Sequence, residues 1–262
     1  MIAPGPALSC QKLSISVPGR TLLTGLELAL NRGDFLAVLG QNGSGKTLTM
    51  HSLAGLRPAD AGQVYLFGEL LGALTRQRIA RNLALLPQSA DDAFPATVIE
   101  TVLIGRHPHI GAFAWESDLD RQIATRSLEL VNLADFSARD IGTLSGGERR
   151  RVAIAQVLTQ QPDVYVLDEP TNHLDPQHQL EVLRIFRDKA LDGATIIASL
   201  HDANLALRYA SHALLLYGDG RWEFGPTSSL LTEDRLSNLY ATRMEAIRWR
   251  GRNIFMATEP AP

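Results

Sequence analysis

The chain has 262 residues, 45% hydrophobic and 20% charged, a composition that fits a globular protein with a sizeable core and excludes a disordered or fibrous one. Its 25 lysines and arginines are balanced by 28 acidic residues, and the net charge of -3 argues against nucleic acid as a partner. The single cysteine, Cys10, excludes an internal disulfide and is interpreted as a small apolar filler. No uncharged run reaches the ~20 residues that span a bilayer, and the N-terminus lacks the pattern of a signal peptide.

The N-terminal third of the chain predicts strands that lead into a glycine-rich turn. Apolar patterns indicate strands at residues 8–17, 22–30, 35–39 and 63–67, and the third of these has the unbroken apolar run of a buried strand. The glycine-rich turn at residues 40–45 precedes a segment compatible with a helix from Lys46 to about Gly55. The predicted order is therefore strand, turn, helix.

The middle and the C-terminal part of the chain differ in their patterns. Helical spacing at residues 98–104, 118–132 and 146–160, interrupted by Pro95, Pro108 and Gly111, predicts a mostly helical subdomain. From residue 164 onward the β-rich runs 164–167, 195–199 and 213–217 alternate with helical stretches at 176–189 and 203–210, which implies a parallel sheet. Apolar runs at 245–249 and 253–257 suggest a terminal hairpin.

The glycine-rich turn matches the phosphate-loop pattern. It also lies between a predicted strand and a predicted helix, the position in which such a loop binds phosphate. Its backbone N–H groups would point at phosphate oxygens, Lys46 would reach the terminal phosphates, and Thr47 would bind magnesium. A glycine-rich turn with an incidental lysine is the alternative, and the flanking elements argue against it. The expected nucleotide-binding residues of this segment are Gly40, Gln41, Asn42, Gly43, Ser44, Gly45, Lys46, Thr47 and Leu48.

Two adjacent acids, Asp168 and Glu169, end the apolar run at residues 164–167. Paired carboxylates at the end of a buried strand are costly unless they are used, and the ends of strands are where α/β sheets place their sites. We assign Asp168 to magnesium and Glu169 to the attacking water, a division that suits phosphoryl transfer to water. The alternative interpretation is that Asp168 caps the N-terminus of a helix and that Glu169 is a solvated surface residue.

A third motif decides the family. Ser145, Gly146, Gly147 and Glu148 precede a helix-compatible run and form a second anion-binding nest at a helix N-terminus. Together GQNGSGKT, LSGGE and VYVLDEP, in this order across nearly the whole chain, resemble the Walker A, signature and Walker B motifs of ABC ATPases.

The resemblance implies an α/β fold: a P-loop NTPase ABC cassette with a RecA-like core, an antiparallel β subdomain and a helical subdomain. Residues 1–262 would form one ABC ATPase domain, with 1–88 and 161–240 as the core and the antiparallel β subdomain, 89–160 as the helical signature subdomain, and 241–262 as a C-terminal hairpin. It also implies ATP and Mg2+ as cofactors, and a head-to-tail homodimer in which the nest of one copy completes the nucleotide pocket of the other.

Further positions resemble functional residues of the family. Gln88 resembles the Q-loop glutamine, which would sense magnesium and the attacking water, and Asp175 resembles the D-loop aspartate at the dimer interface. His201 resembles the switch histidine that contacts the γ-phosphate, although a histidine in isolation is more often a surface residue. Gln88 and Lys46 thus join Glu169 and His201 as the expected catalytic residues. Val17 departs from the family, which has an aromatic residue there to stack on adenine.

The segment from Phe94 to His109 is similar to the stretch after the Q-loop in importers of ferric siderophores, haem and cobalamin. The resemblance implies a groove around residues 88–115 for a polytopic permease, present in two copies, and a periplasmic binding protein that acts indirectly. The chain would then lie at the cytoplasmic face of a bacterial inner membrane as a peripheral subunit. An iron chelate is the expected cargo, with cobalamin or another metal or oxyanion as the alternative. His107 and His109 are interpreted as polar loop residues rather than as metal ligands.

Other functions remain open at this point. A soluble ABC ATPase of the DNA-repair or translation type would be expected to carry a long heptad insertion or a second cassette, and neither is present in this sequence. A P-loop kinase or GTPase would leave the LSGGE motif unexplained, and exporter cassettes are often fused to their membrane domain. The run Arg149-Arg150-Arg151 is interpreted as a solvated helix face.

Overall fold

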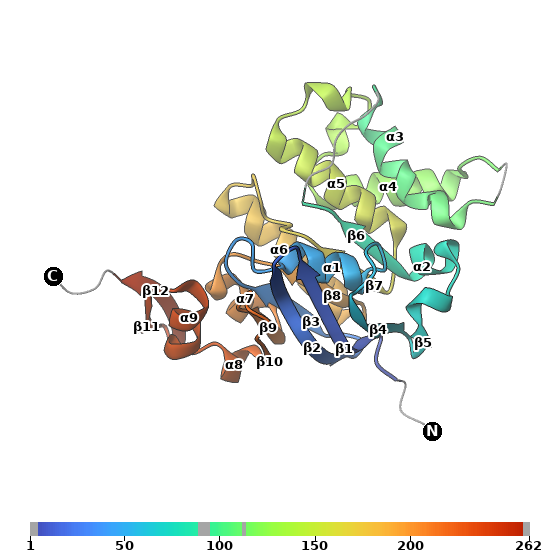
Figure 1. Cartoon of the computed structure of the whole chain (residues 1–262). Helices are drawn as coiled ribbons and strands as arrows, with labels where there is room; N and C mark the ends of the chain where they lie inside the picture. Colours follow the sequence, from blue (N-terminus) through green and yellow to red (C-terminus); the bar gives the residue numbers. More distant parts are fainter. Residues whose placement is uncertain (1–4, 89–94, 112–113, 259–262) are drawn as a thin grey trace.

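The computed structural model describes residues 5–88, 95–111 and 114–258, which fold into a sheet-based body and a helical part that extends from it (Figure 1). The predicted domain boundaries at residues 1, 89 and 262, and Phe94 of the predicted permease segment, lie outside the described residues. None of the helices in the described ranges combines the length and the apolarity of a transmembrane segment.

The body is built on a six-stranded sheet in which five strands run parallel. In spatial order the strands are β10 (Trp222–Pro226), β9 (His212–Leu216), β3 (Phe35–Leu39), β8 (Thr195–Ser199), β7 (Val164–Leu167) and β6 (Leu83–Leu86), with β10 antiparallel to β9. Every residue of β3, β7 and β8 is buried, because both faces of the sheet are covered, one by helices and the other by α1 (Lys46–Leu53) and the antiparallel sheet described below. The carboxyl ends of parallel strands share one edge, so the segments after β3, β6, β7 and β8 meet there.

A second, antiparallel sheet packs against the body. Its strand order is β2 (Arg20–Leu30), β1 (Leu8–Val17), β4 (Ala61–Leu66) and β5 (Glu69–Leu70). Leucines of β1 and β2 are fully buried and share a core with Leu36 and Val38 of β3 and with Met50 and Leu53 of α1 (Lys46–Leu53). Cys10 belongs to this core, and burial raises the pKa of its thiol to about 12, as expected for an apolar filler.

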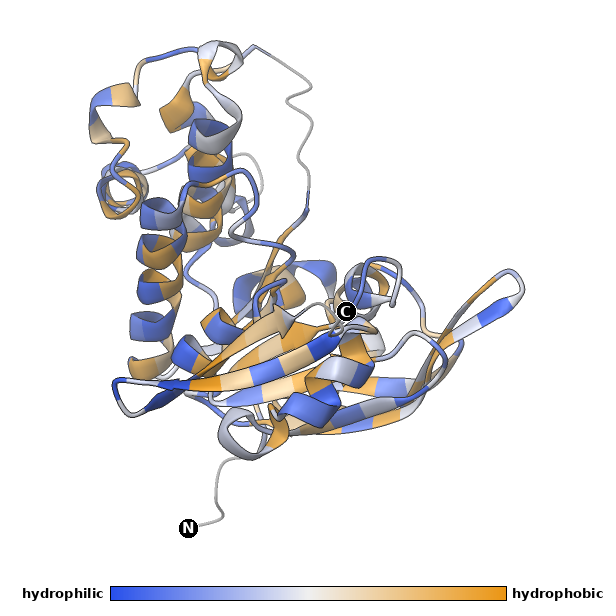
Figure 2. Ribbon diagram, turned by 90° about the vertical axis from the view of Figure 1, so that its left-hand side faces the viewer, coloured by the Kyte–Doolittle hydropathy of each residue, from blue (hydrophilic) through white to orange (hydrophobic). Residues whose placement is uncertain are grey.

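The helical part is formed by α3 (Val98–Leu103), α4 (Asp118–Leu130) and α5 (Gly146–Gln160), together with the 3-10 segments η2 (Ile104–His109), η3 (Ala134–Phe136) and η4 (Ile141–Thr143). Each of the three α-helices begins at a serine or threonine capping box, at Thr97, Ser117 and Ser145. The apolar faces of these helices pack on one another, and the hydrophilic residues on the opposite face of each helix point outward (Figure 2).

The remaining helices of the described residues cover the body. They are α2 (Arg76–Asn82), α6 (Pro176–Leu191), α7 (Ala203–Tyr209), α8 (Thr227–Leu230) and α9 (Glu233–Tyr240), with the 3-10 turn η1 (Leu71–Ala73). The chain then forms the hairpin β11 (Arg243–Trp249) and β12 (Arg252–Thr258), which lies on the side of the body away from the helical part (Figure 1). The terminal hairpin predicted from the sequence is therefore confirmed, and it is longer than predicted.

Candidate functional site

The turn after β3 is a tight loop that only glycine permits at its two ends. A Cβ on Gly40 would lie 2.4 Å from Ser44 Oγ and 2.5 Å from the Leu216 carbonyl oxygen, so a side chain would collide with the loop itself and with β9. Gly45 has a φ of 101° and stands directly before α1, where it turns the backbone into the helix. The loop therefore presents its backbone N–H groups at a helix N-terminus, the arrangement that binds phosphate.

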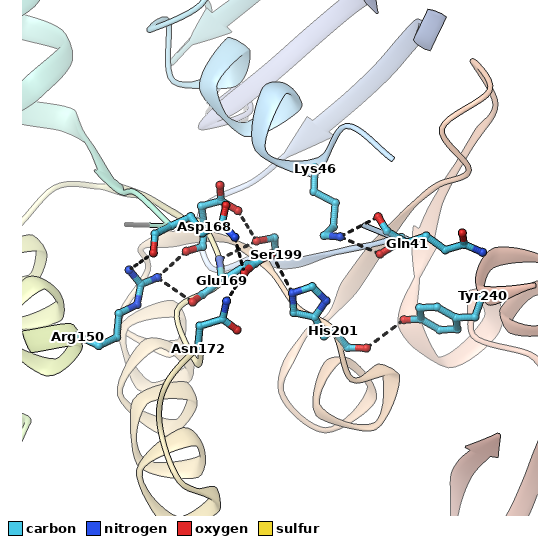
Figure 3. A network of polar contacts seen from close by, with 11 residues as sticks. Gln41, Lys46, Arg150, Asp168, Glu169, Asn172, Ser199, His201 and Tyr240 are labelled. Atoms are coloured by element: carbon cyan, nitrogen blue, oxygen red, sulfur yellow. Dashed lines mark hydrogen bonds and ion pairs between the residues drawn. The ribbon is translucent and has the colours of Figure 1, made fainter. Parts of the chain in front are cut away.

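Lys46 is 5% exposed and lies across this loop. Its Nζ donates hydrogen bonds to the carbonyl oxygens of Gly40 at 2.8 Å and Gln41 at 3.1 Å (Figure 3). Burial lowers the pKa of the ammonium group, while the nearby carboxylates of Glu169 and Asp168 raise it. A cation held against the loop in this way favours an anion as the ligand of the loop.

Asp168 is fully buried at the end of β7 and has one free carboxylate oxygen. Its Oδ1 accepts a hydrogen bond of 2.7 Å from the Ser199 hydroxyl, whereas Oδ2 has no hydrogen-bond partner among the described residues. A buried anionic oxygen without a partner is costly, and carboxylate oxygen is the ligand that Mg2+ prefers. The donor set therefore fits a magnesium ion.

Glu169 points in a different direction because its backbone is left-handed, with a φ of 48°. Its Oε2 accepts hydrogen bonds from Gln88 Nε2, at 3.0 Å, and from Asn172 Nδ2, and its Oε1 lies 2.8 Å from His201 Nε2 (Figure 3). The Glu169 side chain is 9% exposed and that of His201 is 43% exposed, so the imidazole forms the solvent-facing side of the cluster. A carboxylate held between an amide and an imidazole can accept a proton from a water molecule.

The expectation that all three arginines of the 149–151 run form a solvated face is wrong for Arg150. Its side chain is 6% exposed, and its guanidinium donates to four main-chain carbonyl oxygens. The acceptors are Asp168 at 2.5 Å, Pro87 at 2.6 Å, Glu169 at 2.7 Å and Gln88 at 3.3 Å. Burial lowers the pKa of this group to about 10. The side chain points inward because α5 presents position 150 to the body, so that one arginine of α5 joins the ends of β6 and β7.

One cavity of about 600 Å3 brings most of the predicted site residues together. Asn42, Gly43, Gly45, Lys46, Thr47 and Leu48 of the loop line it, and so do Gln88, Glu169 and His201. Gly40, Gln41, Ser44 and Asp168 lie beside these residues without lining the cavity. Asn172, Arg20 and Leu22 line the cavity as well and were not predicted, although Asn172 stands three residues after Glu169 in the motif that signals the site.

The structure does not bring the Ser145 nest into this cavity. Ser145 caps α5 by accepting a hydrogen bond from the Glu148 N–H at 3.3 Å, and Glu148 Oε2 accepts from the Ser145 N–H at 2.7 Å. Hydrogen bonds from the Ser145 side chain and from the Ser145 backbone N–H to the carboxylate lower the pKa of Glu148. None of the residues Ser145, Gly146, Gly147 and Glu148 lines the cavity, and neither does Asp175, which caps α6 and contacts His178.

Comparison with known proteins agrees with these motifs. A sequence model described as ABC transporter matches residues 23–172. A hemin import ATP-binding protein of Deinococcus radiodurans is 41% identical over 221 residues, which cover 82% of this chain and 83% of that protein. A cobalamin import ATP-binding protein of Halobacterium salinarum is 36% identical over 234 residues, 88% of this chain.

Some of the curated relatives are longer than this chain. The match covers 58% of the halobacterial protein and 52% of an ABC transporter ATP-binding protein of Bacillus subtilis, so the chain spans little more than half the length of these relatives. Among solved structures, an inward-facing ABC transporter of the metal-chelate type matches with a TM-score of 0.84 and 29% identity, over 97% of this chain and 98% of that one.

Proposed function

Because this chain belongs to the ABC transporter family, we propose that it binds ATP with magnesium and hydrolyses the ATP to drive an importer. The observation that supports this most directly is that the Glu169 carboxylate lines the same cavity as Lys46 and Thr47 of the phosphate loop. A base beside a triphosphate-binding loop is the arrangement that phosphoryl transfer to water needs.

The loop residues 40–48 take the role of holding the triphosphate through their N–H groups, with Lys46 on the terminal phosphates. Thr47, Gln88 and Asp168 would hold Mg2+, which would neutralise charge on the phosphate oxygens. The free Oδ2 of Asp168 and the position of Thr47 and Gln88 on the cavity wall support this set. A metal ion held there would give Asp168 Oδ2 the partner that it lacks among the described residues.

Glu169 is the proposed general base. Its Oε1 accepts a proton from a water molecule as the water oxygen bonds to the γ-phosphorus and the bond from that phosphorus to the β–γ bridging oxygen breaks. His201 would contact the γ-phosphate and stabilise the charge that develops on it, and its distance of 2.8 Å from the Glu169 carboxylate supports this role. Gln88 holds the other carboxylate oxygen, at 3.0 Å, and so fixes the direction in which the base points.

A homodimer would complete the site. The nest of Ser145, Gly146, Gly147 and Glu148 is an anion site outside the cavity of its own chain, so a second copy can offer it to the triphosphate in the first. Asp175, exposed at the start of α6, would lie at the same interface. Two ATP molecules would then be held between two copies of this chain.

The proposed permease surface lies on the helical part, around residues 88–115. Large apolar side chains are exposed on the described portion of this region and next to it: Ile104 is 46% exposed, Leu119 63% and Trp115 89%. Exposed apolar groups that lie close together mark an interaction surface on a globular protein. Two polytopic permease subunits docked there would hold the dimer at the cytoplasmic face of a bacterial inner membrane, and a periplasmic binding protein would act through the permease.

For the cargo we propose an iron chelate, haem or a ferric siderophore, with cobalamin or another metal or oxyanion cargo as the alternative. The hemin import relative and the metal-chelate transporter structure support the first, and the cobalamin import relative supports the second. The residues that line the cavity described above suit a nucleotide rather than a cargo molecule. We therefore assign the selection of the cargo to the permease and its binding protein.

Phosphate release and reconstitution test the proposal. The purified chain should release phosphate from Mg–ATP, and Lys46→Ala should abolish this, because the loop loses its cation. Reconstituted with a permease encoded beside it and the matching binding protein, the chain should hydrolyse ATP faster when hemin, a ferric hydroxamate or cobalamin is added. Hydrolysis by a chain that binds no permease would instead indicate a soluble ABC ATPase.

A further inference from the structure

One end of the nucleotide cavity is lined by residues to which we have assigned no role in phosphate binding or hydrolysis. Glu169, His201, Gln88 and Asn172 form one wall and the loop residues form the floor, which leaves Val17, Arg20 and Leu22 from the hairpin of β1 and β2. If the loop holds the triphosphate with its terminal phosphate toward Glu169, the nucleoside must lie toward this hairpin. Val17 and Leu22 are aliphatic, and among the described lining residues the only ring is the imidazole of His201, which contacts Glu169.

Arg20 therefore supplies the one planar polar group at this end. We propose that the Arg20 guanidinium stacks on the nucleobase and fixes it, taking the place of an aromatic side chain. A guanidinium is flat, delocalised and weakly hydrated, and it packs on the faces of aromatic rings. The inference rests on the proposed function, since it names how the same cavity recognises the base of its nucleotide.

The guanidinium is held in place rather than free in solution. Its Nε donates a hydrogen bond of 2.8 Å to the Gly218 carbonyl oxygen, in the turn between β9 and β10. A Cβ on Gly218 would lie 2.7 Å from Arg20 Nη2 and 2.9 Å from the Cα of Ser44, so the turn, the guanidinium and the phosphate loop pack directly on one another. Only a glycine, here with a φ of 77°, leaves room for this packing.

The hairpin that carries Arg20 is anchored at the same turn. Val17 and Arg20 are cross-strand partners, and the Thr24 N–H donates to the Gly220 carbonyl oxygen at 3.0 Å while Trp222 Nε1 donates to the Thr24 carbonyl oxygen at 2.9 Å. No carboxylate among the described residues pairs with Arg20, because the nearby Asp219 bonds to Arg221. The guanidinium thus has no anionic partner among the described residues, and Arg20 lines the cavity beside the loop.

Equilibrium binding of Mg–ATP and of Mg–triphosphate, the inorganic ligand without a nucleoside, tests the proposal on the full chain. Arg20→Ala should weaken ATP binding by about tenfold and leave triphosphate binding within about twofold, because only the base loses a contact. Arg20→Lys keeps the charge but not the plane and should bind ATP almost as weakly as Arg20→Ala. Val17→Tyr, added to Arg20→Ala, should restore ATP affinity by supplying a ring.

The control is Arg57→Ala. Arg57 also donates to a main-chain carbonyl of the same hairpin, that of Ser16 at 3.0 Å, but it does not line the cavity, so ATP affinity should stay unchanged. An equal loss of ATP and triphosphate binding in Arg20→Ala, or full affinity in Arg20→Lys, would show that Arg20 acts as a phosphate cation and would overturn the proposal. A wild-type chain that binds neither ligand would instead refute the proposed function.

Discussion

Adjacent carboxylates at the end of β7 have different environments because Ser199 bonds to the carboxylate of Asp168 but only to the backbone N–H of Glu169. Ser199 Oγ accepts a hydrogen bond from the Glu169 N–H at 2.7 Å and donates one of 2.7 Å to Asp168 Oδ1. The left-handed backbone of Glu169 is unfavourable for a residue with a side chain, and such conformations persist where the surroundings over-determine them. Ser199 thereby gives the two carboxylates different roles in our proposal: Asp168 Oδ2 as a magnesium ligand and the Glu169 carboxylate as a proton acceptor.

Glu169→Gln tests the proposed base. The amide keeps the size of the side chain, and its remaining oxygen can still accept from Gln88, but it cannot take up a proton. Turnover should fall by about 100-fold or more, whereas the affinity for ATP should change by less than about threefold. Phosphate release and equilibrium binding measure the two effects separately. Glu223→Gln, which alters a carboxylate bonded to Arg235 outside the cavity, should hydrolyse ATP normally. Near-normal turnover in Glu169→Gln would contradict the assignment.

Arg150→Met tests whether the buried arginine joins the ends of β6 and β7. The substitution fills a similar volume but leaves four main-chain carbonyl oxygens without their donor, so the free energy of unfolding should fall by about 3 kcal/mol. Chemical denaturation monitored by circular dichroism gives this value. Arg126→Met, at an exposed position of α4, should change it by less than about 0.5 kcal/mol. Equal losses in the two variants would contradict the role given to Arg150.

Local motifs explain why much of the candidate site could be predicted from the sequence. The phosphate loop, Asp168, Glu169, Gln88 and His201 all follow directly after strands, and the strand order brings such ends together. Arg150 could not be told from its neighbours, because a run of three arginines carries no sign of which one points inward. Ser199 gave no signal either, since it ends an apolar strand.

At the scale of elements, strong patterns were predicted and short or irregular ones were not. The helix at Gly146–Gln160 and the strands Phe35–Leu39, Val164–Leu167 and Thr195–Ser199 agree with their predicted bounds. The strands β6 and β10 and the helices α2, α8 and α9 were missed. Four residues, as in β6, are too few for a period to show, and the pairing of β6 with β7 comes from the sheet rather than from its own sequence.

The start of α4 carries a titratable contact whose effect on stability can be measured. Asp120 caps the helix through Ser117 and bonds to Arg106 of η2 at 2.8 Å, and these partners lower its pKa to about 2. A carboxylate with a depressed pKa stabilises the folded state above its unfolded pKa of 3.8, and this contribution disappears as the pH falls toward 2. Asp120→Asn should therefore be less stable than the wild type at pH 7, by about 2 kcal/mol, and nearly equal to it at pH 2.

Denaturation curves of both proteins between pH 7 and pH 2 provide the measurement. Asp118→Asn is a suitable control, because Asp118 lies in the first turn of the same helix and is exposed, so its loss should leave the pH profile of the wild type nearly unchanged. A constant difference between Asp120→Asn and the wild type at all pH values would show that the contact does not depend on the charge of Asp120.

At the scale of the whole molecule, the two proposed anion sites of one chain lie apart. The phosphate loop belongs to the sheet-based body and the Ser145 nest to the helical part, and the cavity around the loop does not include the nest. Arg150 connects the two parts, since it lies on the helix that Ser145 caps and bonds to carbonyls of the body. A displacement of the nest would therefore shift the main chain at Gln88 and Glu169 through Arg150. This coupling is what we expect of a site that becomes active only when a second copy closes over it.

Mixing two inactive variants tests whether the nest acts across a dimer. Lys46→Ala removes the loop cation, and Ser145→Arg blocks the nest while leaving ATP binding to the isolated chain intact, so each variant alone should not hydrolyse ATP. If the sites form between copies, a heterodimer contains one site with an intact loop and an intact nest. An equal mixture should then recover about one quarter of the wild-type rate, since half of the dimers are mixed and each has one good site. Phosphate release from the mixture measures this, and a mixture as inactive as its components would place both anion sites in the same chain.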